Sequence, residues 1–256
     1  IPYRHAEAMP RAGFRARFPA VEARFKAAEP SFLTWLDAID GHAGALTAIG
    51  EAAAPAPRWS QMWFPRLDAA MAYTLMRQAR PQRVVEVGSG HSTRFLVRAV
   101  ADGGFKCRII CIDPAPRASI AGLPVERIAT TLSAPGLEAF AELQAGDVVF
   151  IDSSHILMPG TDVDLLLNQV LPSLARGVLV HLHDIFLPDD YPAAWAWRGY
   201  NEQNALACLL TGGAWRIVWT SRYVVTRRPE WITASVAAKL PLQAGAYESS
   251  LWLERR

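Results

Sequence analysis

The sequence predicts an α/β fold, doubly wound around a mostly parallel sheet, with a small helical N-terminal extension. Near-continuous apolar segments alternate with segments of helical periodicity from Trp63 onward, which is typical of a parallel sheet covered on both faces. Four of these apolar segments end at polar residues, as expected where such a sheet presents a ligand site at the carboxyl ends of its strands. The 256 residues suit one large domain with an appendage better than two full domains.

Residues 1–62 differ from the rest of the chain and are predicted to form the extension, set apart from a domain at residues 63–256. Pro19 suits the first turn of a helix that ends near Ala28, and Ser31 suits the N-cap of a second helix. The extension is basic, and we expect its charged face to be solvated, with a partner surface as the alternative. Its basic residues are Arg4, Arg11, Arg15, Arg17, Arg24 and Lys26, and its apolar helix face carries Phe14, Phe18, Val21 and Phe25.

The elements of the larger domain follow from periodicity and from the glycine and proline residues between them. They are predicted as helices over 65–79, 92–101, 137–143, 162–174 and 201–210, strands over 83–87, 107–112, 125–129, 147–151, 177–182, 215–226 and 249–254, and a loop over 229–243.

Composition describes an ordinary soluble protein. The formal net charge is +2, so no nucleic-acid partner is indicated. No stretch approaches the ~20 apolar residues of a membrane span, and no signal peptide opens the sequence, so we expect a cytoplasmic protein without a membrane partner. Cys107 and Cys111 lie roughly 13 Å apart on a predicted strand, too far to form a disulfide, which favours reduced thiols. The sequence is compatible with a monomer and with a homo-oligomer.

The stretch from Glu86 to Thr93 reads as a strand, a glycine turn and the start of a helix. Gly88 and Gly90 allow close approach of a ligand to the backbone, and the helix N-terminus offers unpaired N–H groups. Asp113 falls 23 residues after Gly90, where a carboxylate binds the ribose hydroxyls of an adenosine. The dinucleotide pattern G-x-G-x-x-G has Thr93 at its third glycine position, and no phosphate-binding P-loop motif is present.

Four motifs resemble those of class I S-adenosylmethionine-dependent methyltransferases, in the branch with E-x-G-S-G-x-S-T, I-D-x-x-H and H-D-I motifs. The resemblance covers about residues 63–256 and implies a Rossmann-like, seven-stranded sheet with a reversed last strand, and S-adenosylmethionine as cofactor. The motifs are Glu86-Val-Gly-Ser-Gly-His-Ser-Thr93, Ile112-Asp113-Pro114, Val149-Phe-Ile-Asp152-Ser-Ser-His155 and Leu179-Val-His-Leu-His-Asp184-Ile185.

The resemblance also implies where the cofactor binds. The glycine turn lies under the methionine part, Asp113 on the ribose, Asp152 near the methionine amino group, and residues 131–133 near the adenine. Two roles stay open, because Glu86 is either a ligand or an acid that braces the turn, and Ser92 with Thr93 either caps the helix or contacts cofactor. The predicted cofactor-binding residues are Glu86, Gly88, Ser89, Gly90, Ser92, Thr93, Asp113, Asp152 and Ser153.

Methyl transfer to a hydroxyl needs a general base or a metal that removes the proton. His155, His183 and Asp184 are the candidate catalytic residues, whereas His181 is predicted to be a core histidine. Asp152, His155, His183 and Asp184 are candidate ligands of a divalent metal. The resemblance does not favour a metal, because catechol-type methyltransferases hold magnesium with oxygen ligands and have Asp-Asn where this chain has His183-Asp184.

The loop over residues 189–203 is rich in aromatic and polar residues and is predicted to form a wall of the acceptor site. Arg198, Tyr200 and Asn201 suit a polar small-molecule acceptor, sugar-like or a natural product; the alternative is core packing by the tryptophans and a helix cap at Asn201. The predicted function is therefore methyl transfer to a hydroxyl of a small molecule. The alternatives are a nicotinamide-dependent oxidoreductase and a non-catalytic cofactor-binding scaffold protein.

Overall fold

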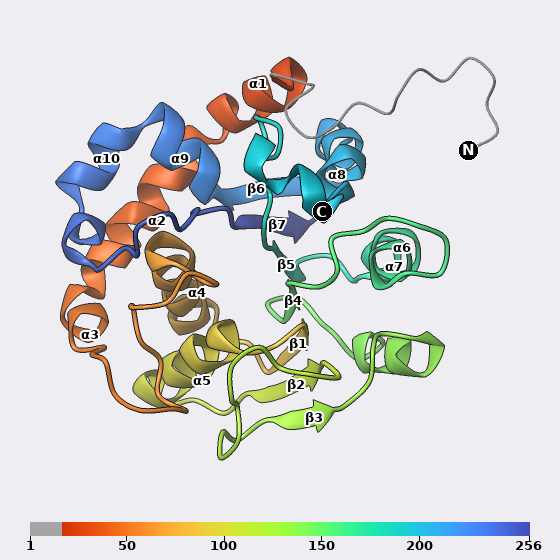
Figure 1. The fold of residues 1–256 in the computed structure, drawn as a ribbon, viewed down its shortest axis with the longest axis horizontal. Coiled ribbons are helices and arrows are strands. Elements are labelled where there is room, and N and C mark those ends of the chain that lie inside the picture. Colours follow the sequence, from red (N-terminus) through yellow and green to blue (C-terminus); the bar gives the residue numbers. More distant parts are fainter. Residues whose placement is uncertain (1–16) are drawn as a thin grey trace.

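The computed structural model describes residues 17–256, in which seven strands form one sheet (Figure 1). The order is β3–β2–β1–β4–β5–β7–β6, and β7 alone runs antiparallel to its neighbours β5 and β6. This confirms the predicted seven-stranded, mostly parallel sheet with a reversed last strand. The strands are β1 (Arg83–Val87), β2 (Arg108–Ile112), β3 (Glu126–Ile128), β4 (Val148–Ile151), β5 (Leu179–Leu182), β6 (Trp215–Thr220) and β7 (Leu251–Arg255).

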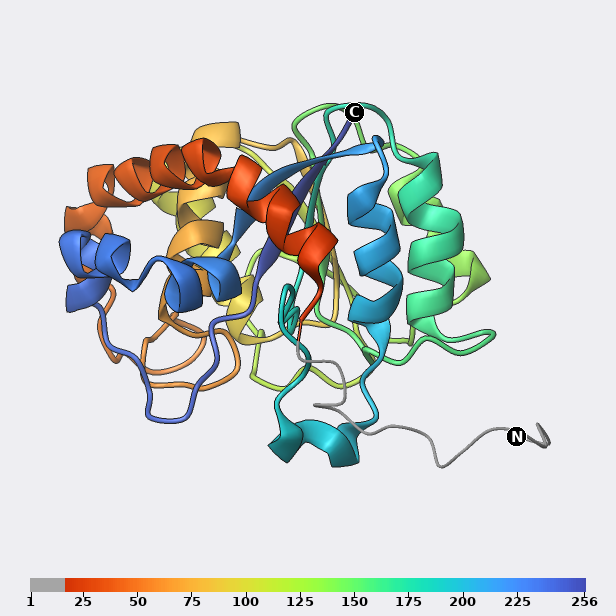
Figure 2. The same ribbon diagram turned by 90° about the horizontal axis from the view of Figure 1, so that it is seen from above.

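Helices cover both faces of the sheet, as the alternating pattern predicts (Figures 1 and 2). In Figure 1, α2, α4 and α5 lie to the left of the sheet, and α6, α7 and α8 lie to its right. The helices are α1 (Pro19–Ala27), α2 (Glu29–Gly41), α3 (Ala43–Thr47), α4 (Arg66–Ala79), α5 (His91–Gly103), α6 (Asp162–Leu165), α7 (Leu171–Ser173), α8 (Glu202–Thr211), α9 (Ser221–Arg227) and α10 (Pro229–Ala234), with 3-10 turns η1 (Ala134–Phe140), η3 (Ala193–Arg198) and η4 (Val236–Lys239) and a π-helical turn η2 (Leu166–Val170).

The described part of the N-terminal extension packs on the sheet. Phe25 and Phe32 are fully buried, and the ring of Phe32 meets Trp219 of β6 edge-on at 5.9 Å. The prediction of Ser31 as an N-cap is wrong, because α2 begins at Glu29 and the Ser31 hydroxyl donates a hydrogen bond to the Val218 carbonyl. The predictions about Arg4, Arg11, Phe14 and Arg15 lie outside the described residues.

Two further predictions of secondary structure are wrong. The strand predicted over 215–226 ends at Thr220, the last residue that pairs with β7, and the chain turns there into α9. The Thr220 hydroxyl caps that helix by accepting from the Tyr223 backbone N–H. The loop predicted over 229–243 contains α10 and η4. In both places tertiary packing outweighed the intrinsic preference of β-branched and loop-forming residues.

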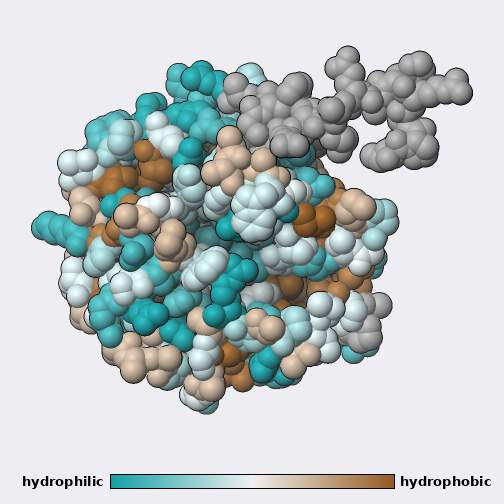
Figure 3. Space-filling view, in the orientation of Figure 1, coloured by the Kyte–Doolittle hydropathy of each residue, from teal (hydrophilic) through white to brown (hydrophobic). Residues whose placement is uncertain are grey.

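On the face seen in Figure 3 hydrophilic side chains predominate, and apolar ones form small, separated groups. Within residues 17–256, none of the helices combines the length and the apolar character needed to cross a bilayer. Cys107, Cys111 and Cys208 are free thiols, in keeping with the predicted reduced state.

Candidate active site

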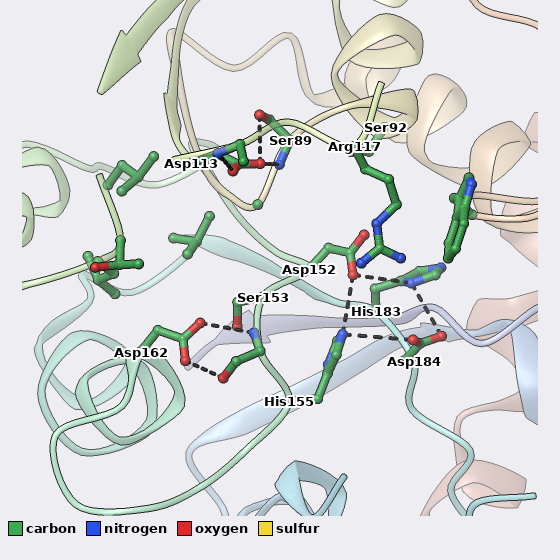
Figure 4. Close-up of a pocket in the computed structure, with 18 of the residues that line it drawn as sticks. Ser89, Ser92, Asp113, Arg117, Asp152, Ser153, His155, Asp162, His183 and Asp184 are labelled. Carbon is green, nitrogen blue, oxygen red and sulfur yellow. Dashed lines mark hydrogen bonds and ion pairs between the residues drawn. The ribbon is translucent and has the colours of Figure 1, made fainter. Parts of the chain in front are cut away.

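A cavity of about 270 Å³ lies over the carboxyl ends of the four central parallel strands (Figure 4). The strands are in register, so Val87, Ile112, Ile151 and Leu182 end together. The residues that follow them, namely Gly88, Asp113, Asp152 and His183, all line the cavity. This is the position at which open α/β sheets bind their ligands, where the connections from β1 and from β4 leave toward opposite faces.

Gly88 is required for close packing of the chain at the end of β1. Its φ is +80°, and a Cβ at this position would lie 1.8 Å from the Asp152 backbone oxygen. The Asp152 N–H donates to the Val87 carbonyl at 2.9 Å, which holds the end of β4 against the turn. The chain itself therefore requires glycine at this position, which also lines the cavity.

Glu86 braces the glycine turn from below the cavity. Its carboxylate is fully buried and accepts hydrogen bonds from the Ser92 and Thr93 hydroxyls, each at 2.6 Å. Thr93 Oγ1 in turn accepts from the Gly90 N–H at 2.9 Å. Glu86, Gly90 and Thr93 are not in the cavity lining, whereas Ser89 and Ser92 are. Of the roles left open, the structure gives Glu86 and Thr93 that of holding the turn.

Burial raises the pKa of Glu86 to about 7, which makes a testable prediction about stability. Between pH 4.5 and 7 the unfolded chain releases this proton and the folded chain keeps it, so the free energy of unfolding falls as pH rises. Glu86→Gln removes the titration. We expect the variant to gain stability relative to wild type by about 1.4 kcal/mol per pH unit in this window. Urea unfolding at pH 5, 6 and 7 measures it, and a stability difference independent of pH would contradict it.

Asp113 is fixed at the end of β2 by the same turn. One of its oxygens accepts from the Ser89 N–H at 2.6 Å and from the Ser89 hydroxyl at 3.0 Å, and the other accepts from the Ala115 N–H at 2.7 Å. An ionised carboxylate accepts about four hydrogen bonds, so acceptor capacity remains for a ligand.

Two buried polar atoms of the cavity lining lack a hydrogen-bond partner, namely Ser153 Oγ and His91 Nδ1. Burial lowers the pKa of His91 to about 4, so this ring is neutral at physiological pH. Buried polar atoms are normally paired, and unpaired ones in a cavity are the atoms that a polar ligand satisfies. Both atoms therefore fit a cofactor with several polar groups. The sequence prediction missed His91, which it contained only as one position of the motif from Glu86 to Thr93, before a helix expected to begin at Ser92.

Two imidazoles and two carboxylates converge on one side of the cavity (Figure 4). His155 Nε2 lies 3.3 Å from Asp152 Oδ1 and 3.8 Å from Asp184 Oδ2. His183 Nδ1 lies 3.5 Å from both Asp152 Oδ1 and Asp184 Oδ1. The structure thus brings together the four residues that the sequence singled out at the ends of β4 and β5.

The opposite charges of these imidazoles and carboxylates shift their pKa values. Burial by itself would lower the pKa of His155, but hydrogen bonds to Asp152 and Glu202 outweigh it and raise the pKa well above its usual value. Burial likewise opposes the charge of His183, and the carboxylates of Asp152 and Asp184 raise its pKa well above the usual value. Burial would raise the pKa of Asp152, but the neighbouring imidazoles hold it well below its ordinary range. Asp152, His155 and His183 therefore titrate as one network.

Each histidine of this network has a second, buried carboxylate partner that the sequence prediction missed. Glu202, the first residue of α8, accepts from His155 Nδ1 at 2.9 Å, and Asp68 of α4 lies 3.3 Å from His183 Nε2. Both carboxylates are fully buried. They are 47 and 115 residues from their partners, so no local spacing indicated them. In the sequence, each acid shows only that it lies in the first turn of a helix. Exposed acids are common at that position too, so it does not indicate a buried partner.

The His155 backbone is also locked to the start of α8. Its φ is +58°, and its carbonyl oxygen accepts from the N–H groups of Asn201 and Glu202. The Asn201 side chain does not cap the helix but accepts from the Leu157 N–H at 2.6 Å and donates to the Leu157 carbonyl at 3.2 Å. A strained conformation held by this many contacts is typical of a residue with a positioned role.

A metal ion was the sharper of the sequence-based alternatives for these side chains. Among residues 17–256, no group of three or more histidine, cysteine, aspartate or glutamate side chains is arranged to hold one. The facing nitrogens and oxygens of the network lie at or near hydrogen-bonding distance, as paired acids and imidazoles.

His181 is a core residue, as expected. It is fully buried, stacks on Phe150 with ring centroids 3.7 Å apart, and its Nε2 lies 2.8 Å from the Ser250 hydroxyl. The loop over 189–203 does contribute to the cavity through Tyr200, whose ring centroid lies 4.5 Å from that of His155. Trp197 in the same loop is exposed, so it is not part of the core.

A seven-stranded sheet with a reversed last strand and an acid at the end of β2 defines the class I S-adenosylmethionine-dependent methyltransferase fold. Residues 85–185 match a family model described as a methyltransferase domain, and this range contains the four quoted motifs. The chain therefore carries a methyltransferase domain on a sheet of the class I topology, and its cofactor is S-adenosylmethionine. The nicotinamide-dependent alternative is set aside. No match is found among the curated proteins.

Solved structures of similar fold include a Podospora anserina methyltransferase with S-adenosylhomocysteine bound, 16% identical, covering 86% of this chain and 88% of that one, with a TM-score of 0.46. An O-methyltransferase from Bacillus cereus in complex with S-adenosylhomocysteine is 13% identical, with coverage of 87% and 91% and a TM-score of 0.41. A branched-chain polyamine synthase from Thermus thermophilus, in complex with N4-aminopropylspermidine and 5'-methylthioadenosine, is 17% identical, with coverage of 100% and 72% and a TM-score of 0.42.

Proposed function

We propose that the protein transfers the methyl group of S-adenosylmethionine to a hydroxyl group of a small molecule, with His155 as the general base. One observation carries the proposal. His155 presents Nε2 to the cavity beside Asp152 and Asp184, while its Nδ1 is held by the buried carboxylate of Glu202. A carboxylate on one imidazole nitrogen fixes the tautomer, so that the neutral ring, which forms above its raised pKa, accepts a proton at Nε2.

The cofactor would lie along the ends of β1, β2 and β4. In this placement Asp113 accepts from the ribose hydroxyls, Gly88 and Ser89 lie under the methionine part, and residues 131–132 flank the adenine. Ser153 Oγ and His91 Nδ1 would find hydrogen-bond partners on the bound cofactor, which explains why the protein leaves them unpaired.

Methyl transfer from a sulfonium is an in-line displacement, so alignment of the acceptor oxygen with the methyl group supplies much of the acceleration. The acceptor hydroxyl loses its proton to His155 Nε2 as its oxygen forms the new bond to carbon, and the sulfonium leaves as a neutral thioether. The imidazolium that forms lies between Asp152 and Glu202, and these carboxylates stabilise its charge. Proton removal of this kind contributes about 10²- to 10⁴-fold.

The experiment that tests the proposal combines binding and transfer. We expect S-adenosylhomocysteine to bind in a calorimetric titration, and label from methyl-labelled S-adenosylmethionine to appear in hydroxylated compounds but not in their O-methylated counterparts. Transfer to amines alone, or cofactor binding without transfer to any of a broad panel, would contradict the proposal, and the second outcome would favour a binding protein. Repeating the assay after dialysis against EDTA shows whether an exchangeable metal ion is essential.

A further inference from the structure

A second cavity, of about 230 Å³, adjoins the first and has no assigned role. Trp63 and Asp184 line both cavities, so the second one opens beside the network that contains His155. Three segments far apart in the sequence form it, and they lie on one side of the molecule in Figure 2. Its lining consists of Met62, Trp63, Asp184, Trp195, Arg198, Gly245, Ala246 and Tyr247.

The walls of this cavity are aromatic and fixed in place. The rings of Trp195 and Tyr247 meet at 86° with centroids 5.5 Å apart, and the buried ring of Phe186 packs against both. On the other side, Trp63 carries the Arg117 guanidinium 4.1 Å from its ring centroid. Flat apolar faces at fixed angles bind a ring-shaped ligand, because large contact area is gained with little loss of side-chain freedom.

Arg198 gives the cavity a positive charge without a carboxylate partner among residues 17–256. Its guanidinium lies 4.1 Å from the Trp195 ring centroid and 5.3 Å from that of Tyr200. Nη1 donates to the Tyr200 hydroxyl at 3.0 Å, while Nε is buried and makes no hydrogen bond. Two other arginines near this part of the sheet, Arg222 and Arg227, are paired with Asp189. Tyr200 and Trp195 thus hold the Arg198 guanidinium in place without a carboxylate partner among residues 17–256, and a guanidinium fixed in this way binds a carboxylate through its remaining N–H groups.

The carboxylate of Asp184 at the junction does not cancel this charge. It lies 3.5 Å from His183 and 3.8 Å from His155, and its Oδ1 accepts from the Ser249 hydroxyl. Its charge is therefore directed toward the two imidazoles. An occupant of the second cavity would meet a hydrogen-bonding group at the Asp184 end and a cation on Arg198.

We propose that this second cavity is the acceptor subsite and that it takes a monocyclic hydroxy acid, with the ring between Trp63, Trp195 and Tyr247 and the carboxylate on Arg198. A hydroxyl on the ring then faces the junction with the cofactor cavity. The proposal rests on the proposed function, since it names the class of acceptor. A hydroxybenzoate and a hexuronic acid share this chemistry, and the experiment distinguishes them.

The test is calorimetric binding to the protein saturated with S-adenosylhomocysteine. The probes are 3-hydroxybenzoate, 4-hydroxybenzoate and glucuronate, each beside its methyl ester, which has the same ring and no charge. We expect at least one acid to bind about 10- to 100-fold more tightly than its ester, the effect of a charge-assisted bidentate pair. Arg198→Gln should remove that difference by weakening the acid alone. Arg80→Gln is the matched control, because Arg80 also lies over a ring, that of Phe105, outside both cavities.

The outcomes separate the two proposals. Tighter binding of the hydroxybenzoates identifies an aromatic acceptor and tighter binding of glucuronate a sugar acid, and either result supports the subsite. Equal affinity of acids and esters, or no binding of any probe while S-adenosylhomocysteine still binds, overturns the subsite and leaves the proposed function standing. An unchanged preference for acids in Arg198→Gln also overturns it, and retained S-adenosylhomocysteine binding shows that this variant is folded.

Discussion

His155→Asn is expected to lower kcat by about 10²- to 10⁴-fold, with affinity for S-adenosylhomocysteine within about threefold of wild type. The substitution removes the proposed base but leaves the cofactor contacts of Asp113 and the glycine turn in place. Asparagine is chosen because His155 has a φ of +58°, a conformation that asparagine tolerates better than alanine. Single-turnover rates with saturating cofactor, and calorimetric titration of each variant, measure the two quantities.

Glu202→Gln tests whether His155 acts as a base or only supports the loop in which it lies. The variant keeps a hydrogen-bond acceptor for His155 Nδ1 and removes the negative charge. Because Glu202 raises the pKa of His155, and because only the neutral imidazole accepts a proton, wild-type activity should rise with pH through a pKa above 6.5. In Glu202→Gln this rise should move to lower pH. An unshifted pH profile of activity in Glu202→Gln would contradict the role of Glu202. Full activity of His155→Asn, together with loss of activity in His183→Ala, would instead identify His183, at the end of β5, as the base.

Asp113→Ala is expected to weaken S-adenosylhomocysteine binding by about 100-fold or more. Hydrogen bonds to a charged group contribute roughly 1.5–3 kcal/mol each, and the proposed ribose contact has two. The variant also leaves the Ser89 N–H without its acceptor, so part of the loss would come from the turn. Calorimetry measures the affinity, and thermal unfolding of the free protein measures the structural part.

Asp113→Asn provides the control for that structural part. Asparagine has one acceptor oxygen, which can take the Ser89 N–H, whereas its NH2 group then faces the Ala115 N–H, so half of the turn's hydrogen bonding is kept while the charge is lost. We expect about 10-fold weaker binding, a melting temperature between those of wild type and Asp113→Ala, and a kcat near wild type once cofactor is saturating. Wild-type affinity in both variants would show that the ribose does not lie on β2.

The sequence by itself determined the sheet and the strand ends. Apolar β-branched segments alternating with helical ones leave few arrangements other than a parallel sheet, and the polar residues directly after them must then meet at one edge. Asp113, Asp152 and His183 were located in this way, because their positions depend only on where a strand stops. The glycine turn was also found, although the sequence did not show that Gly88 is needed for the close contact with Asp152.

Tertiary structure decided how those residues are charged and held. Glu202 reaches His155 and Asp68 reaches His183 only after α8 and α4 dock on opposite faces of the sheet. Long-range docking likewise ended β6 at Thr220, because β7 offers no further partner there. It also assembled the second cavity from three distant loops. Local periodicity reports which face a residue occupies, whereas the partner of a buried charge depends on packing between elements remote in the chain.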